Sequence, residues 1–186
     1  MWPTNWRKTV YEVIFSALLL LHGNCLAANF VQLHDEASVS DMGGVINYAL
    51  SRMGKTLQLA EVKPLGENED YYLFGYTSNQ PPNGSAVLAF ANKAGKISKM
   101  AFIAAEENAQ GIRECHDVLF AALVSLGATA KQADQIISSA FLRSENYIAG
   151  FWSRSTSRRY VVKLAPQGEY PMYGAFGTFT LYAVDE

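Results

Sequence analysis

Cysteine is nearly absent from this chain, and its scarcity limits how the fold can be held together. Only Cys25 and Cys115 occur among the 186 residues. Cys25 lies in an amino-terminal segment that we expect to be removed, so the remaining chain has one thiol and cannot form an internal disulfide. The fold must therefore depend on its hydrophobic core, which a domain of this size can supply.

A large excess of charge of either sign is also missing. The formal net charge is −2, so no global positive field is present to attract nucleic acid or anionic lipid. Hydrophobic residues make up 49% of the chain and charged residues 17%, which excludes a disordered chain and predicts a folded domain.

Long hydrophobic runs are absent as well, apart from a short one near the start. The run at residues 13–21 is much shorter than the roughly 20 residues that a membrane-spanning helix needs. Arg7 and Lys8 precede it, and the small residues Ala27 and Ala28 follow it. This order is typical of a secretory signal peptide that is cleaved after export.

The expected cleavage separates residues 1–27, the signal peptide, from residues 28–186, a single globular domain. An uncleaved anchor and a lipid-bearing Cys25 are the weaker alternatives, since the run is short and bulky or polar residues precede Cys25. No stable membrane span is expected after cleavage. Exported eukaryotic domains more often carry several disulfides, so we favour the bacterial periplasm over an extracellular location.

The spacing of apolar residues predicts three helices. Residues 35–53 repeat apolar side chains every three or four positions, with capping oxygens at the start and Gly54 at the end. Gly43 and Gly44 weaken this helix, and a close approach to a strand would explain them. Residues 106–126 and a segment from Thr129 to about residue 141 predict a helical hairpin.

Alternating patterns predict about seven strands, connected by short turns that favour antiparallel neighbours. The expected strands are residues 56–62, 71–78, 85–92, 96–104, 147–154, 159–165 and 172–184, and a turn is expected at residues 64–68. The fold class is therefore α+β: antiparallel sheet in one or two pieces, with an N-terminal helix and a central helical hairpin packed on one side. The order also fits two helix-then-sheet halves, 28–104 and 105–186, although no residues visibly repeat between them.

Motifs for catalysis, cofactor binding or metal binding are missing, and we assign no residue to any of these roles. Cys115 and His116 are adjacent, but neighbouring helical residues point about 100° apart, and Cys115 lies on an apolar stripe typical of a buried, inert thiol. Without residues 1–27 the chain keeps two histidines and one cysteine, which are too few for a zinc site. The acidic residues Glu67, Glu69 and Asp70 match no calcium loop, so we interpret them as a solvated turn.

Two clusters remain as candidate surfaces. The first is an arginine hairpin in which Arg154, Arg158 and Arg159 surround a Ser-Thr-Ser turn beside Trp152. Arginine and tryptophan are enriched at binding hot spots, although a solubilising turn is the simpler explanation. We expect Arg154 and Arg159 to lie nearly opposite one another. The second is the aromatic stripe Tyr72, Phe74 and Tyr76, which is more often core than a ligand platform.

These observations favour a non-catalytic binding or inhibitor-like module of the cell envelope, acting through a protein–protein interface. The expected partner is another envelope or secreted protein with an acidic surface, and nucleic acid is not expected. The alternatives are a small envelope hydrolase whose scattered site a sequence does not reveal, and an assembly factor of a secretion or surface apparatus. The sequence does not determine the oligomeric state.

Overall fold

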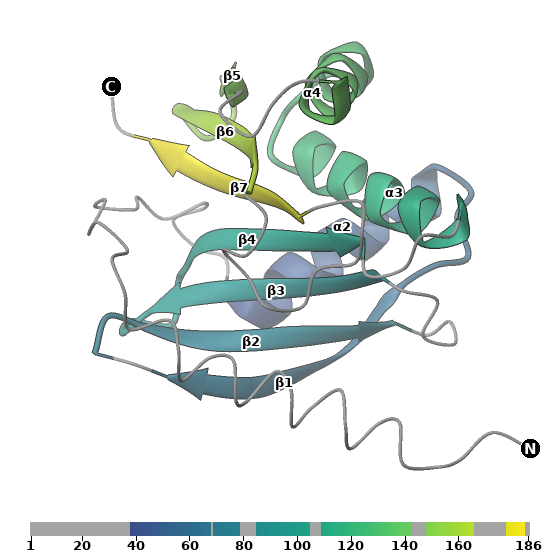
Figure 1. Cartoon of the computed structure of the whole chain (residues 1–186). Coiled ribbons are helices and arrows are strands. Elements are labelled where there is room, and N and C mark those ends of the chain that lie inside the picture. The colour runs from purple at the N-terminus through teal and green to yellow at the C-terminus, as the bar shows by residue number, and fades with distance from the viewer. Residues whose placement is uncertain are drawn as a thin grey trace, which may run out of the picture.

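One antiparallel sheet of seven strands with three helices forms the described part of the chain (Figure 1). The computed structural model describes residues 38–67, 69–78, 85–104, 109–142, 148–165 and 178–184. The expected signal peptide, residues 28–37 and residues 172–177 of the last expected strand lie outside these ranges. Within them, no helix is long and apolar enough to cross a membrane.

Element labels follow Figure 1. The helices are α2 (Val39–Arg52), α3 (Ala109–Ser125) and α4 (Ala130–Leu142). The strands are β1 (Leu59–Glu67), β2 (Tyr71–Ser78), β3 (Ser85–Asn92), β4 (Ile97–Ala104), β5 (Ile148–Ser153), β6 (Arg158–Leu164) and β7 (Thr178–Val184). These bounds confirm the α+β prediction and resolve its open point, because all seven strands belong to one sheet.

The sheet joins two antiparallel meanders side by side. Its strand order is β1-β2-β3-β4-β7-β6-β5, so the last strand of each meander meets the other at the centre. There Met100 pairs with Leu181 and Phe102 with Phe179. Strands β1 and β5 are the two edges.

The three helices share one hydrophobic core with one face of the sheet. Ile46 and Leu50 of α2, Leu119 of α3 and Ile137 of α4 lie in the same cluster as Phe102. The opposite face, here called the second face, carries a smaller buried cluster. It consists of Leu73, Leu88, Phe90, Ala101, Ile103 and Ala165. Along β2, β3 and β4, neighbouring residues therefore enter different clusters, as the period of two predicts.

Local signals explain where the helices begin. The Ser38 hydroxyl accepts from the backbone N–H of Asp41 while the Asp41 carboxylate accepts from the backbone N–H of Ser38, a capping box. The Ser38 hydroxyl and the Ser38 backbone N–H both donate to the Asp41 carboxylate, at 2.6 and 3.0 Å, and these two hydrogen bonds lower the pKa of Asp41. Thr129 and Gln132 form the same arrangement before α4. The predicted Thr129 capping box is confirmed.

A close approach explains Gly43, as the sequence suggested. A Cβ at Gly43 would lie 2.9 Å from Cε1 of Tyr76, whereas one at Gly44 would meet nothing within 4 Å. The Tyr76 hydroxyl donates to the carbonyl of Val39, 2.5 Å away. Asn47 also joins α2 to the sheet, because its amide bonds both backbone groups of Leu59 at 2.6 and 2.7 Å.

Strand β1 is the main correction to the predicted elements. We expected a strand at 56–62 and a turn at 64–68, but β1 continues to Glu67. Proline lacks the N–H that a central strand needs, yet an edge strand can place it toward solvent. Two register shifts, at Leu59/Val62 and Pro64/Gly66, adapt the strand to it. The turn prediction was wrong because sequence alone did not show that β1 is an edge.

Candidate functional site

The arginine hairpin is built by β5, β6 and the turn at residues 154–157. Trp152 pairs with Arg159, and Ser153 with Arg158. Directly paired residues share a face, so Trp152 and Arg159 lie together on the second face. Arg158 lies on the helix side, and Arg154 belongs to the turn.

The expected opposition of Arg154 and Arg159 is therefore wrong. The turn takes up four residues and ends at Ser157, whose φ of 52° lies in the left-handed region. The predicted strands end at residue 154 and resume at residue 159, which places the turn one residue later than the observed turn. A tryptophan thus lies opposite Arg159, so direct like-charge repulsion is not what distinguishes this hairpin.

Hydroxyl groups hold the turn in one shape. The Ser153 and Ser155 hydroxyls are 3.0 Å apart, and the backbone N–H of Thr156 donates to the Ser153 hydroxyl at 3.4 Å. The hydroxyl of fully buried Tyr160 donates to the Thr156 hydroxyl at 2.9 Å. A turn fixed in this way displays its arginines with less ordering entropy to lose on binding.

The α3–α4 connection supports the turn from the helix side. Gly127, with a φ of +98°, lies so close that a Cβ would be 2.6 Å from the hydroxyl oxygens of both Ser153 and Ser155. Only glycine combines this backbone conformation with this approach. The hairpin is therefore held against the helical layer, and sequence reasoning missed Gly127 because it gave this residue only the role of ending a helix.

The surface beside the hairpin is cationic and aromatic. Trp152 is 47% exposed, and Arg154 and Arg159 are exposed. Strand pairing extends this face inward, since Lys163 pairs with Thr180 and Thr180 with Ala101 of the second face. The four strands β4, β5, β6 and β7 contain no Asp or Glu.

Two lysines add to this surface, and the sequence analysis did not identify either. Lys163 is half-buried, and Lys99 has its ammonium 4.2 Å from the centre of the Phe90 ring. Both belong to strands that alternate in the same phase as Arg159. Their proximity depends on the β4–β7 pairing, which no local pattern reveals.

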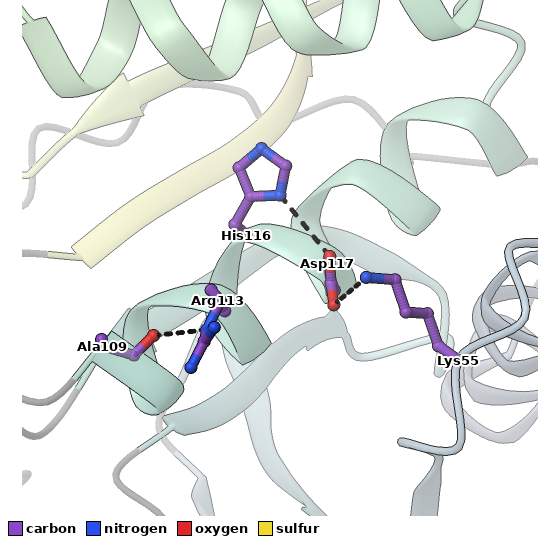
Figure 2. Close-up of polar contacts among 5 residues, drawn as sticks. All are labelled: Lys55, Ala109, Arg113, His116 and Asp117. Carbon is purple, nitrogen blue, oxygen red and sulfur yellow. Dashed lines mark hydrogen bonds and ion pairs between the residues drawn. The ribbon is translucent and has the colours of Figure 1, made fainter.

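The second titratable cluster lies on α3 and joins it to the end of α2 (Figure 2). Lys55 Nζ lies 2.8 Å from Asp117 Oδ2, and His116 Nδ1 lies 3.7 Å from Asp117 Oδ1. His116 also stacks on the ring of Phe120, one turn further along α3. Lys55, in the segment that follows α2, thus forms a partly exposed ion pair with Asp117 of α3, and ion pairs of this kind contribute little stability.

Cys115 is buried, as predicted. Its exposed fraction is 2%, and burial raises the pKa of its thiol from 9.0 to about 12. A thiol in this state is nearly all protonated at neutral pH, and the thiolate is the nucleophile. Cys115 therefore fills space in the core and does not serve as the base-activated partner of His116.

Three further features were weighed as sites. Among the described ranges, no group of three or more His, Cys, Asp or Glu is placed to hold a metal ion. Glu67, Glu69 and Asp70 are exposed, and Glu67 lies 3.8 Å from Lys93. Of the aromatic stripe, Tyr76 belongs to the core and Phe74 packs against it, so the core interpretation is confirmed for these two residues.

Comparison with protein-family models, with curated protein sequences and with solved structures finds no match for this chain.

Proposed function

We propose that this chain is an exported, non-catalytic binding or inhibitor-like module whose protein–protein interface is centred on the arginine hairpin. The partner is an envelope or secreted protein that presents carboxylates. The observation that carries the proposal is the braced turn: Trp152 lies exposed beside Arg159 on a hairpin fixed by Ser153 and Gly127.

The chemistry of this surface favours an acidic protein partner. Guanidinium groups form strong, often bidentate hydrogen bonds with carboxylates, and a neighbouring tryptophan supplies apolar contact area. Strands β4 to β7 contribute cations and no carboxylates, so the protein itself provides no competing anion in these strands. Such a surface attracts acidic partners and loses affinity as salt rises.

Site-specific photo-cross-linking tests the location of the interface. A photoreactive phenylalanine analogue would replace Trp152 in one variant and Tyr48 in another, because Tyr48 is an aromatic residue on α2 that is more exposed than Trp152, 69% against 47%. We expect a discrete adduct in envelope extract from position 152 and not from position 48. Adducts from position 48 alone would place the interface elsewhere.

Charge variants test the chemistry of the same surface. One variant combines Arg154→Gln, Arg158→Gln and Arg159→Gln. It should bind the partner captured at position 152 more weakly, and its affinity should depend less on salt concentration. The matched control changes three exposed cations on the helices, Arg52, Arg113 and Lys131, to Gln. Each triple variant should change the free energy of unfolding by no more than about 0.5 kcal/mol per site. If both variants bound the partner equally well at low salt, the result would show that the hairpin is only a solvated turn and not part of the interface.

Export is part of the proposal and has its own test. The mature protein should begin at Ala28 or Asn29, which amino-terminal sequencing of the exported form measures. A mature form that still begins at Met1, or one with lipid on Cys25, would refute it.

A further inference from the structure

Strand β5 is one edge of the sheet, and its outer side is a candidate surface for binding another strand. Among the described strands it pairs only with β6. An edge strand directs every second backbone N–H and C=O away from its neighbour, and these groups form a template for another strand. Proteins usually blunt such edges with charges, proline, or bulges.

The opposite edge, β1, carries all of these protections. It contains Lys63, Pro64 and Glu67. Its pairing with β2 is interrupted by two register shifts, which twist an edge and disturb its hydrogen-bonding row. A second chain would therefore find no regular row of donors and acceptors along β1.

Strand β5 carries none of them. Its sequence, Ile-Ala-Gly-Phe-Trp-Ser, has no charged residue and no proline. Its register with β6 runs without interruption from Ile148 opposite Lys163 to Ser153 opposite Arg158. Among the described residues, the contrast between the two edges of the sheet indicates that β5 is available to pair with another strand.

Packing also keeps β5 in place. Ala149 and Phe151 belong to the main core, and Ser153 is fully buried beneath Gly127. At Gly150 a Cβ would lie 2.5 Å from the carbonyl oxygen of Tyr160, so glycine permits the close pairing of β5 with β6. The strand is thus a fixed template and needs little reorganisation to accept a partner.

We propose that the outer edge of β5 binds an extended, carboxylate-bearing segment of the partner protein as an eighth strand. This inference rests on the proposed function and names the form in which the partner binds. Backbone hydrogen bonds supply affinity in such strand addition, and side chains supply specificity. Arg154 follows the end of β5 directly, and Arg159 lies about 10 Å from an added strand, twice the usual strand spacing. Arginine and glutamate side chains together span that distance.

Charge disfavours the other occupant of this edge, a second copy of the chain. Pairing β5 with β5 of another copy would bring together two surfaces that carry Arg159, and the strands β4, β5, β6 and β7 contain no Asp or Glu. Like charges across an interface oppose association, whereas an acidic strand relieves the repulsion. The acidic partner is therefore the occupant that the structure favours.

The test uses blocked eight-residue peptides in which valine alternates with glutamate. Residues 28–186 would be titrated with this peptide, with a copy N-methylated at every second residue along one edge, and with a copy that has lysine in place of glutamate. We expect binding at low salt by the first peptide and by the copy methylated on the edge that faces away from β5. A copy methylated at every residue has no N–H donor on either edge and should not bind, and the lysine peptide should bind at least tenfold more weakly.

Amide hydrogen exchange on the same samples locates the contact. Outward-facing amides of β5 should gain protection at least tenfold, while those of β1 serve as the internal control. Protection at β1, no protection at either edge, no binding of the glutamate peptide, or equal binding of both methylated forms would overturn the proposal. A peptide-independent dimer paired through β5 in sedimentation and exchange measurements would overturn it in favour of a second copy.

The arginine variants separate this inference from the proposed function. If Arg154→Gln, Arg158→Gln and Arg159→Gln weaken partner binding but β5 amides gain no protection, the hairpin surface stands and strand addition fails. If β5 amides gain protection with a peptide whose affinity the variants leave unchanged, strand addition stands and the arginine-centred interface fails.

Discussion

Replacing Gly127 with alanine tests whether the hairpin is held against the helical layer. Gly127 has a φ of +98°, and its missing Cβ would lie 2.6 Å from the hydroxyl oxygens of Ser153 and Ser155. Two effects therefore act together in Gly127→Ala: backbone strain and steric overlap. Ser153 is fully buried and hydrogen-bonded within the turn, so it has little room to move away.

The two effects have separable magnitudes. Holding an L residue in such a backbone conformation costs about 1–3 kcal/mol, and restricting the unfolded chain recovers about 0.4–1 kcal/mol of it. Forcing an extra methyl into a packed contact adds about 1–3 kcal/mol. We expect Gly127→Ala to lower the free energy of unfolding by about 2–4 kcal/mol, with a fall in melting temperature of roughly 2–4 °C for each kcal/mol.

Gly54→Ala and Gly95→Ala are the matched controls. These glycines have φ values of 72° and 77°, and a Cβ at either would meet nothing within 4 Å. Denaturant unfolding should show that Gly127→Ala costs at least about 1 kcal/mol more than either control. In a Ser153→Ala, Ser155→Ala background the nearest remaining atom is Cβ of residue 153 at 3.6 Å, so the excess should disappear. An equal cost for all three glycines in the unchanged protein would refute the argued contact.

Other substitutions test the core and its connections. Burial raises the pKa of Cys115 from 9.0 to about 12, so the thiol ionises at a lower pH in the unfolded chain than in the folded one. The neutral, buried thiol therefore contributes its full stability below pH 9. This contribution is lost between pH 9 and pH 12, by at most about 1.4 kcal/mol per pH unit. Cys115→Ala should flatten the pH dependence of unfolding in that window, and Tyr76, whose pKa burial also raises, titrates in both proteins and cancels in the comparison. Rapid labelling of the native thiol at pH 7 would contradict the buried assignment. Asn47→Ala should cost about 2–3 kcal/mol in denaturant unfolding, because both backbone groups of Leu59 lose their partner, and a loss below about 0.5 kcal/mol would show that water replaces the amide.

Local patterns in the sequence were enough to predict most elements. The predicted strands 71–78 and 85–92 match β2 and β3, and the burial of Cys115 followed from its position on a helical stripe. Gly43 was also interpretable, because two glycines in a helix have a cost that packing against Tyr76 explains. These features depend on interactions between residues close in sequence or on one repeating face.

Features that depend on distant pairing could not be predicted. Nothing local shows that Pro64 lies on an edge, that Gly127 touches the Ser153 turn, or that Lys99 and Arg159 belong to the same face. The register of the arginine hairpin was missed because the turn was expected one residue too late, since Arg154 is as compatible with the end of a strand as with the start of a turn. The candidate site was therefore located from sequence, but its geometry was not.

The central pairing of β4 with β7 has a consequence for how the protein is made. Synthesis produces the β1–β4 meander first, and β4 then has an unpaired edge until β7 has been added to the chain. Strand β6 likewise has one unpaired edge until β7 has been made. The nascent chain therefore exposes two open edges in its interior strands, and intermediates of this kind are prone to aggregation. A chain that travels unfolded through an export channel would need protection of β4 and β6 until β7 closes the sheet.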